Sequence, residues 1–195
     1  QSVSYPLISG RWPGPNIVVG KKDVPVDTWF VGGLLGEQLI YSGLSVAHMS
    51  LTFSLTCGAS SVALIGQDLA YAEEGHSHAP NTAPLSAVKR EEERGRFPVE
   101  GALGGKVMTN HMWQTFIQLF ERIISAAPVS VFDCTEGGAL IKGTVVTQFA
   151  DFIAENVQKA EQAIQRFVPS GIANEAKTEG VLGRIKTMKN QFNAL

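Results

Sequence analysis

The chain has 195 residues, a length that fits one domain with a sizeable core or a core with a helical appendage. Apolar residues make up 44% of it and charged residues 17%, as in an ordinary globular protein. The formal net charge of −2 excludes the basic surface typical of nucleic-acid-binding proteins and of proteins held to anionic membranes.

Two cysteines, Cys57 and Cys134, stand in apolar surroundings and are too few for a disulfide framework. We expect both to be buried and reduced, which favours a cytoplasmic location. No run of about 18 apolar residues is present, so no membrane span is expected. The chain begins at Gln1 without a methionine, and we expect it to be a fragment of a longer protein.

The first half of the chain predicts loops, a helix and a strand, in that order. Residues 1–40 are rich in glycine and proline and predict loops with one or two strands. A helix is expected from Ser45 to Cys57, with Ser42 or Ser45 as its N-cap and Gly58 ending it. The continuous apolar run at 61–66 (SVALIG) predicts a strand buried on both faces of a parallel sheet.

The second half adds helices and one more strand. Apolar residues at helical spacing predict a helix over 109–126, with Trp113 and the phenylalanines facing the core. A buried strand is expected at 129–132, and amphipathic helices at 148–167 and 175–192. The order predicts an α/β fold, a Rossmann-like parallel sheet flanked by helices and part of a larger domain. We expect a Rossmann-like domain at 1–145, incomplete at its N-terminus, and a C-terminal helical segment at 146–195.

The loop after residue 66 carries many titratable side chains. Open parallel sheets bind ligands at the carboxyl ends of their strands, where this loop begins. An aspartate there suits ribose hydroxyls, a tyrosine suits a phosphate, and a histidine suits proton transfer near neutral pH. The alternative is a turn with surface histidines. The candidate residues are Gln67, Asp68, Tyr71, His76 and His78.

A zinc or manganese site is a weaker interpretation of the same loop. His76 and His78, with Asp68 or Glu74, have donor atoms that such metals accept. No further cluster of ligands stands nearby in the sequence, so no metal site is predicted.

A second polar loop, TEGGALIKGT at 135–144, follows the second predicted strand and should lie at the same edge of the sheet. Its glycines let backbone amides approach a phosphate or sugar closely, and Lys142 can neutralise charge. The order of a Walker loop is absent, and a glycine-rich turn before a helix is an equal alternative. The candidates are Thr135, Glu136, Gly137, Gly138 and Lys142.

The start of the first predicted helix is a third candidate. Ser42, Gly43 and Ser45 precede it, and free amides at a helix N-terminus attract anions. A plain N-cap explains the serines equally well. His48 is expected to be a core histidine. The segment Gly104-Gly105-Lys106 fits a substrate loop or a hairpin followed by a helix cap.

These segments resemble a known family. The stretches SGLSVAHMSLTFSLTCGASSVALIGQDLAYAEEGHSHA and FDCTEGGALIKGT are similar to the central domain of bacterial motility accessory factor glycosyltransferases, over about residues 40–145. That family's implied activity is transfer of a nonulosonic acid, of pseudaminic or legionaminic type, from its CMP-activated form. The implied acceptors are serine and threonine hydroxyls of flagellin in the cytoplasm. The domain is also distantly similar to bacterial sialyltransferases and to a pterin diphosphokinase group.

The resemblance implies roles for the same residues. Ser42, Gly43 and Ser45 would lie near the nucleotide, Asp68 would lie by the ribose or cytosine, and the 135–142 loop would close over the ligand. Where the family usually has Gly-Gly-Ser, this chain has Leu44 as the middle residue, which blocks close backbone approach.

The implied reaction is a displacement at the anomeric carbon of the sugar, without a metal. His76 or His78 is the expected base, Tyr71 a donor to the departing CMP, and Glu136 an acceptor for sugar hydroxyls. One alternative is a Mg²⁺-dependent pterin diphosphokinase, with Asp68 and Glu73 or Glu74 on the metal. Another is an inactive module that binds flagellin or a chaperone.

Overall fold

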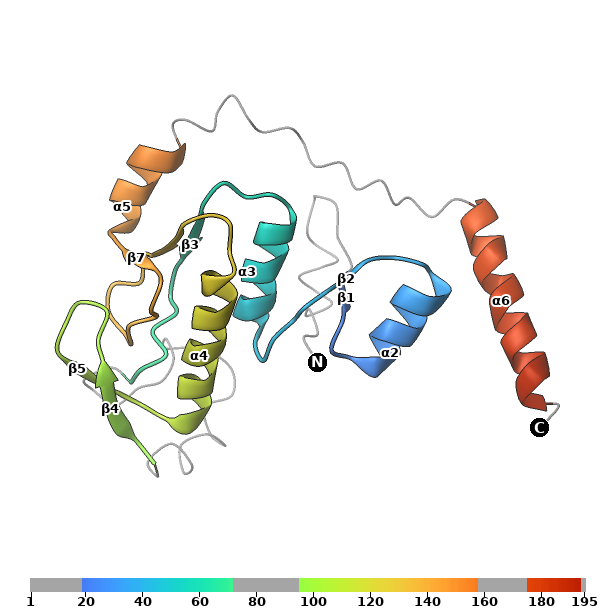
Figure 1. Cartoon of the computed structure of the whole chain (residues 1–195), viewed down its shortest axis with the longest axis horizontal. Coiled ribbons are helices and arrows are strands. Elements are labelled where there is room, and N and C mark those ends of the chain that lie inside the picture. Colours follow the sequence, from blue (N-terminus) through green and yellow to red (C-terminus); the bar gives the residue numbers. More distant parts are fainter. Residues whose placement is uncertain (1–18, 72–94, 158–174, 194–195) are drawn as a thin grey trace, which may run out of the picture. The chain divides into compact units, whose positions relative to one another are not determined.

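A computed structural model of the chain describes residues 19–71, 95–157 and 175–193, and Figure 1 shows the ribbon. The chain forms two compact units, which are described separately: unit 1 comprises Gln1–Met49 and Gln165–Leu195, and unit 2 comprises Ser50–Ile164. These bounds differ from the domains expected at 1–145 and 146–195, and that division stays a prediction.

Unit 1 contains a two-stranded parallel sheet. Strand β1 (Gly20–Lys21) pairs with β2 (Leu39–Ile40), with Gly20 opposite Leu39. The connection between them is helical, with α2 (Pro25–Asp27) followed directly by a π-helix, η1 (Thr28–Leu34). Proline at the first helical position of α2 loses no hydrogen bond, because the amide there has no partner within the helix. Parallel strands need such a crossover, because the chain must return to the same end of the sheet before the second strand begins.

Helix α3 (Val46–Thr56) confirms the predicted helix and its caps. The Ser45 hydroxyl oxygen accepts the backbone N–H of His48 (3.3 Å), so Ser45 is the N-cap. Gly58 follows the helix with a φ of 80°, a left-handed conformation that glycine adopts without a Cβ penalty. His48 is fully buried, with Nδ1 2.6 Å from the Ser45 hydroxyl, which confirms it as a core histidine.

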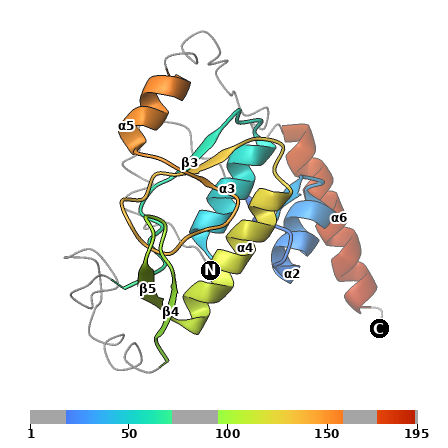
Figure 2. The ribbon, with the colours of Figure 1, turned by 60° about the vertical axis from the view of Figure 1, so that its left-hand side comes forward.

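Unit 2 is built on a three-stranded parallel sheet in the order β3-β6-β7. Its strands are β3 (Val62–Leu64), β6 (Val131–Asp133) and β7 (Val145–Val146). Val62 lies opposite Val131 and Leu64 opposite Asp133, so β3 and β6 end at the same level. Helix α4 (His111–Ser125) lies between them in sequence, and Figures 1 and 2 show it alongside α3. The mixed α/β fold with parallel sheets flanked by helices is therefore confirmed.

An antiparallel hairpin precedes α4. Strand β4 (Phe97–Glu100) pairs with β5 (Lys106–Thr109), and the turn holds Gly104 and Gly105 with φ of 89° and 72°. The side chain of Asn110 then accepts the amide of Trp113 (2.9 Å) as the N-cap of α4. Of the two interpretations of residues 104–106, the hairpin followed by a helix cap is the one that the structure contains.

The core of unit 2 lies along α4, as its apolar spacing predicted. Trp113 is 8% exposed and Phe120 is 0% exposed, while Met112 in the first turn is 58% exposed. Ile117 forms a cluster with Ala70 and Ala139, which come from the loops that follow β3 and β6. Burial of these side chains thus fixes α4 against the loops of the candidate site.

Several predictions about individual segments were wrong in part. Cys57 is exposed, because it follows the last turn of α3, whereas Cys134 is buried as expected. Ile65 is 54% exposed, so the apolar run is not buried on both faces along its whole length. The predicted helix over 148–167 begins as α5 (Phe149–Phe152) and continues as a π-helix, η2 (Ile153–Val157); residues 158–167 lie outside the described part.

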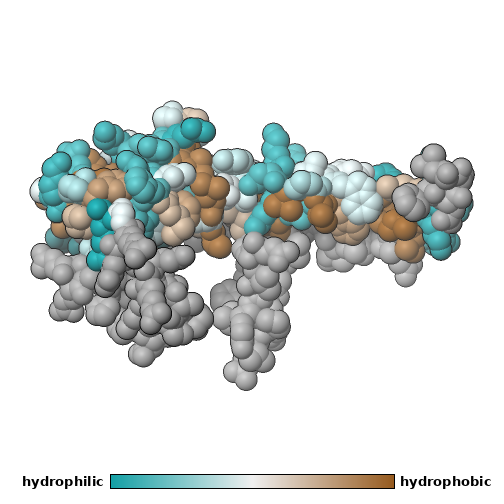
Figure 3. All heavy atoms as spheres, turned by 90° about the horizontal axis from the view of Figure 1, so that it is seen from below, coloured by the Kyte–Doolittle hydropathy of each residue, from teal (hydrophilic) through white to brown (hydrophobic). Residues whose placement is uncertain are grey.

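The C-terminal helix α6 (Glu175–Asn193) was predicted and belongs to unit 1. Its Arg184 donates through Nη1 to the carbonyl of Leu34 at the end of η1 (2.9 Å). Figure 3 shows hydrophobic residues at the surface. The exposed large hydrophobic side chains of unit 1 include Trp29, Leu182 and Met188. Among the helices of the described residues, none has the length and apolar character needed to cross a membrane.

Candidate functional site

The loops that leave β3 and β6 meet at one edge of the sheet of unit 2. The backbone N–H of Gln67, after β3, donates to the side-chain oxygen of Thr135, after β6 (3.1 Å). The N–H of Cys134 donates to the carbonyl of Leu64 (2.9 Å), so the strands stay paired up to their ends. The prediction that both polar loops lie at the same edge is confirmed.

A second contact joins the two loops further from the strands. The N–H of Ala139 donates to the carbonyl of Asp68 (2.7 Å). Gly138 has a φ of 80°, and a Cβ there would lie 2.5 Å from the Cα of Asp68, far inside van der Waals contact. Only glycine permits this approach, which explains one of the glycines that the sequence singled out. Gln67, Asp68, Thr135 and Gly138 thus form one group, the strand-edge group.

The strand-edge group combines exposed and buried polar side chains. Asp68 and Glu136 are exposed and Gln67 is half-buried, whereas Thr135 is only 5% exposed. Gly137 lies between Glu136 and Gly138 in the loop itself. Lys142, further along, is exposed beside α4, where its backbone N–H donates to Glu121 (3.1 Å).

Asp133 is a residue of this edge that the sequence analysis missed. It is the last residue of β6 and is 0% exposed. Its Oδ1 accepts the N–H of Thr135 (3.0 Å), and its Oδ2 has no hydrogen-bond partner among the described residues. Burial raises the pKa of Asp133 above its ordinary value; hydrogen bonds from Thr135 oppose this rise, and the charge of Asp68 adds to it. The signal in the sequence was a carboxylate ending an otherwise apolar strand.

The raised pKa of Asp133 predicts a pH-dependent stability. The folded protein binds the proton of the Asp133 carboxyl more tightly than the unfolded chain does, because an aspartate in the unfolded chain has a pKa of about 3.9. The ionised carboxylate therefore costs stability above the folded pKa, and the cost disappears as the pH falls toward about 3.9. We expect Asp133→Asn to be more stable than wild type at neutral pH, by a margin that shrinks as the pH falls.

Urea unfolding between pH 7 and pH 4 measures this margin. Asp151→Asn is the control, because Asp151 is an exposed carboxylate of α5 in the same unit. Asp68 is the charged group that acts on the Asp133 carboxyl. The neutral Cys134 thiol responds to it, because burial and then the charge of Asp133 raise the pKa of that thiol. A margin that grows as the pH falls would contradict the prediction.

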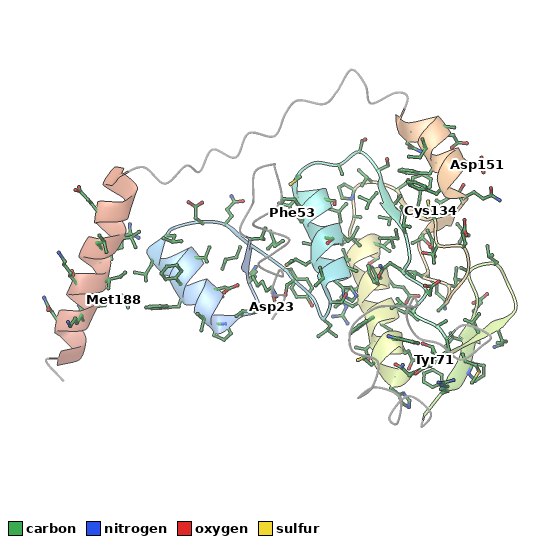
Figure 4. All side chains as sticks on the ribbon, turned by 180° about the vertical axis from the view of Figure 1, so that it is seen from behind. Asp23, Phe53, Tyr71, Cys134, Asp151 and Met188 are labelled. Atoms are coloured by element: carbon green, nitrogen blue, oxygen red, sulfur yellow. The ribbon has the colours of Figure 1, made fainter. Side chains whose placement is uncertain are left out.

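Tyr71 lies away from the strand ends, at the start of α4 (Figure 4). Its hydroxyl accepts a hydrogen bond from the Asn110 side chain (2.8 Å) and its ring packs on Trp113, with centroids 4.6 Å apart. The guanidinium of Arg96 lies 3.7 Å from the ring centroid, in cation–π geometry. These contacts give the buried Tyr71 a role in fixing the loop after β3; its role as a donor to CMP stays a prediction. His76 and His78 lie outside the described residues, as do Glu73 and Glu74.

Unit 1 places Ser42, Gly43 and Ser45 in a polar groove of about 330 Å³. The groove lies where β1 and β2 end and α3 begins, and Lys21 and Asp23 also line it. The N–H (3.2 Å) and hydroxyl (2.9 Å) of Ser42 both donate to the carboxylate of Asp23, which Figure 4 labels.

These hydrogen bonds act on the pKa of Asp23. Partial burial acts to raise the pKa of Asp23, but the bonds from Ser42 and the charge of Lys21 outweigh it and hold the pKa below its ordinary value. Ser42 and Ser45 therefore both have structural partners, Ser42 in the Asp23 carboxylate and Ser45 as the N-cap of α3. Leu44 is 60% exposed, so its side chain points away from the packed interior.

The described residues contain no group of three or more histidine, cysteine, aspartate or glutamate side chains placed to hold a metal ion. Comparisons with family models, characterised proteins and solved structures find no match to this chain. The candidate function therefore rests on the geometry of the sites and on the motif resemblance.

Proposed function

We propose that this chain is the nucleotide-sugar-binding part of a cytoplasmic glycosyltransferase that moves a CMP-activated nonulosonic acid onto serine or threonine hydroxyls of flagellin. The observation that most supports it is the meeting of two polar loops, through Gln67 and Thr135, at the carboxyl edge of a parallel sheet. Sheets of this type bind nucleotides at that edge. The ligand class comes from the resemblance of the same loops to the motility accessory factor family.

Under this proposal the strand-edge group holds the nucleotide. Asp68 is exposed and accepts hydrogen bonds from ribose hydroxyls or from the cytosine amino group. Gly137, where a Cβ would meet nothing within 4 Å, lets the backbone approach the ligand, while Gly138 holds this loop against Asp68. Ser42, Gly43 and Ser45 line the groove of unit 1 with Lys21 and Asp23, and their place near the nucleotide comes from the resemblance.

Transfer requires a base and a stabilised leaving group. A histidine, His76 or His78, takes the proton of the acceptor hydroxyl, whose oxygen then attacks the anomeric carbon. The bond from that carbon to the phosphate oxygen breaks, and CMP leaves as an anion stabilised by Tyr71 and by backbone amides. Glu136, which is exposed, accepts hydrogen bonds from the sugar, and no metal takes part.

One observation favours a second candidate, the Mg²⁺-dependent pterin diphosphokinase. Asp68 lies near enough to Asp133 for its charge to raise the pKa of that buried carboxyl. Two neighbouring carboxylates are common ligands of Mg²⁺ in phosphoryl-transfer enzymes. This candidate predicts that nucleotide binding requires the metal, and the glycosyltransferase predicts that it does not.

Calorimetric titration of CMP and CDP into the purified chain, first with EDTA and then with Mg²⁺, distinguishes these functions. We expect CMP to bind in EDTA, and Asp68→Ala to weaken binding by about tenfold or more, because it removes a charged hydrogen-bond acceptor. Asp151→Ala, which removes an exposed carboxylate from α5, should bind as wild type does.

The other outcomes each point to one alternative. Binding that occurs only with Mg²⁺ would favour the diphosphokinase. The absence of any binding would overturn the enzyme proposals for this chain and leave a module that holds flagellin or a chaperone. Binding of CMP without transfer from a CMP-nonulosonate to flagellin would favour an inactive module.

A further inference from the structure

We infer that Asp133 is a ligand-binding residue whose Oδ2 accepts a hydrogen bond from a ribose hydroxyl of the bound nucleotide, beside Asp68. This inference rests on the proposed function, since it names a contact within the same site. Asp133 lies in the stretch FDCTEGGALIKGT but was not among the candidate residues, and the argument for it comes from three features of its surroundings.

The first feature is the unused oxygen. Asp133 is 0% exposed, and its Oδ2 has no hydrogen-bond partner among the described residues. A buried acceptor without a partner costs free energy of folding, and such groups in native proteins call for an explanation such as a ligand or a catalytic role. An isolated carboxylate costs more than a neutral group, so a purely structural site would favour asparagine here.

The second feature is the other carboxylate oxygen of Asp133, Oδ1, which already accepts a hydrogen bond within the protein. Oδ1 accepts the N–H of Thr135 (3.0 Å), and Thr135 in turn accepts the N–H of Gln67 (3.1 Å). The carboxyl group is therefore held in one orientation by the loops of the strand-edge group. An acceptor fixed in this way loses little entropy when a ligand donates to it.

The third feature is the position of Asp68. Asp68 is exposed in the loop after β3, and its charge contributes to the raised pKa of Asp133 at the end of β6. Both residues lie where these paired strands end, at one edge of the sheet, and two acceptors at that edge suit the two neighbouring hydroxyls of a ribose. A phosphate or a carboxylate does not fit there, because it would add negative charge to two acidic groups.

The test combines a variant with a ligand that lacks the hydroxyls. CMP and 2′,3′-dideoxy-CMP are titrated into wild type, Asp133→Asn and the control Asp151→Asn. Asparagine keeps an oxygen for the Thr135 amide but presents an N–H₂ group in place of the free oxygen. We expect wild type to bind CMP about ten- to a hundredfold more tightly than the dideoxy form, as for a hydrogen bond to a charged group.

In Asp133→Asn the preference for CMP over its dideoxy form should fall to a small fraction of the wild-type value. The reason is that the substitution and the missing hydroxyls remove the same interaction. The stability of the unliganded variant, measured in urea, should equal or exceed that of wild type at neutral pH. That result would show that weaker binding does not come from a loss of folding.

Each other outcome overturns a definite claim. If wild type binds CMP and its dideoxy form equally, the inference fails without any variant, and the proposed function stands. The same holds if Asp133→Asn keeps the full preference of wild type. If wild type binds neither nucleotide, the proposed function fails, and the inference fails with it.

Discussion

Replacing Gly138 with alanine is expected to lower the free energy of unfolding by about 3 kcal/mol and to abolish nucleotide binding at the strand-edge group. Gly138 has a φ of 80°, which costs an L-residue about 1 kcal/mol or more. A Cβ there would also lie 2.5 Å from the Cα and 2.8 Å from the carbonyl carbon of Asp68, where backbone cannot yield easily. The two loops must then separate, at an overpacking cost of about 1–3 kcal/mol.

Gly104→Ala is the matched control for this change. Gly104 has a φ of 89° in the hairpin turn, and a Cβ there meets nothing within 4 Å. It carries the backbone penalty without the clash, so we expect a loss of about 1 kcal/mol. Urea unfolding and CMP calorimetry on both variants measure the difference. Equal losses in the two variants would show that the contact between Gly138 and Asp68 does not hold the loops together.

Replacing Phe120 with alanine is expected to destabilise the protein by about 3–5 kcal/mol, the usual cost of removing a buried phenylalanine. Phe120 is 0% exposed on the inner face of α4, the same face that carries Ile117 against Ala70 and Ala139. Loss of that packing loosens α4 from the loops after β3 and β6. Urea unfolding monitored by tryptophan fluorescence, to which Trp113 on the same helix contributes, measures this change.

Met112→Ala provides the comparison on the same helix. Met112 is 58% exposed, so its truncation removes little buried surface, and we expect a change within about 0.5 kcal/mol. If Phe120→Ala were as mild as Met112→Ala, α4 would not be the core helix of unit 2. A large loss in both variants would mean that the outer face of α4 is covered in solution.

Local signals in the sequence located the main helices and strands. Ser45 and Gly58 bound α3 because a hydroxyl cap and a left-handed glycine act within a few residues of the chain. The apolar runs predicted β3 and β6 as parallel strands, and the spacing on α4 predicted its buried face. Because parallel strands end at the same edge of a sheet, the sequence predicted that the two polar loops meet there. The hydrogen bond between Gln67 and Thr135 confirms that prediction.

The sequence by itself therefore determined the α/β character, the caps and spacing of α3 and α4, and which loops carry polar groups. Only the tertiary structure decided that Cys57 is exposed, that Gly138 packs on Asp68, and that Asp133 is buried with a free oxygen. The reason is the range of the interactions. Caps and periodicity act between residues a few positions apart, whereas the surroundings of Asp133 depend on Asp68, which is distant in sequence and near only after β3 and β6 have paired.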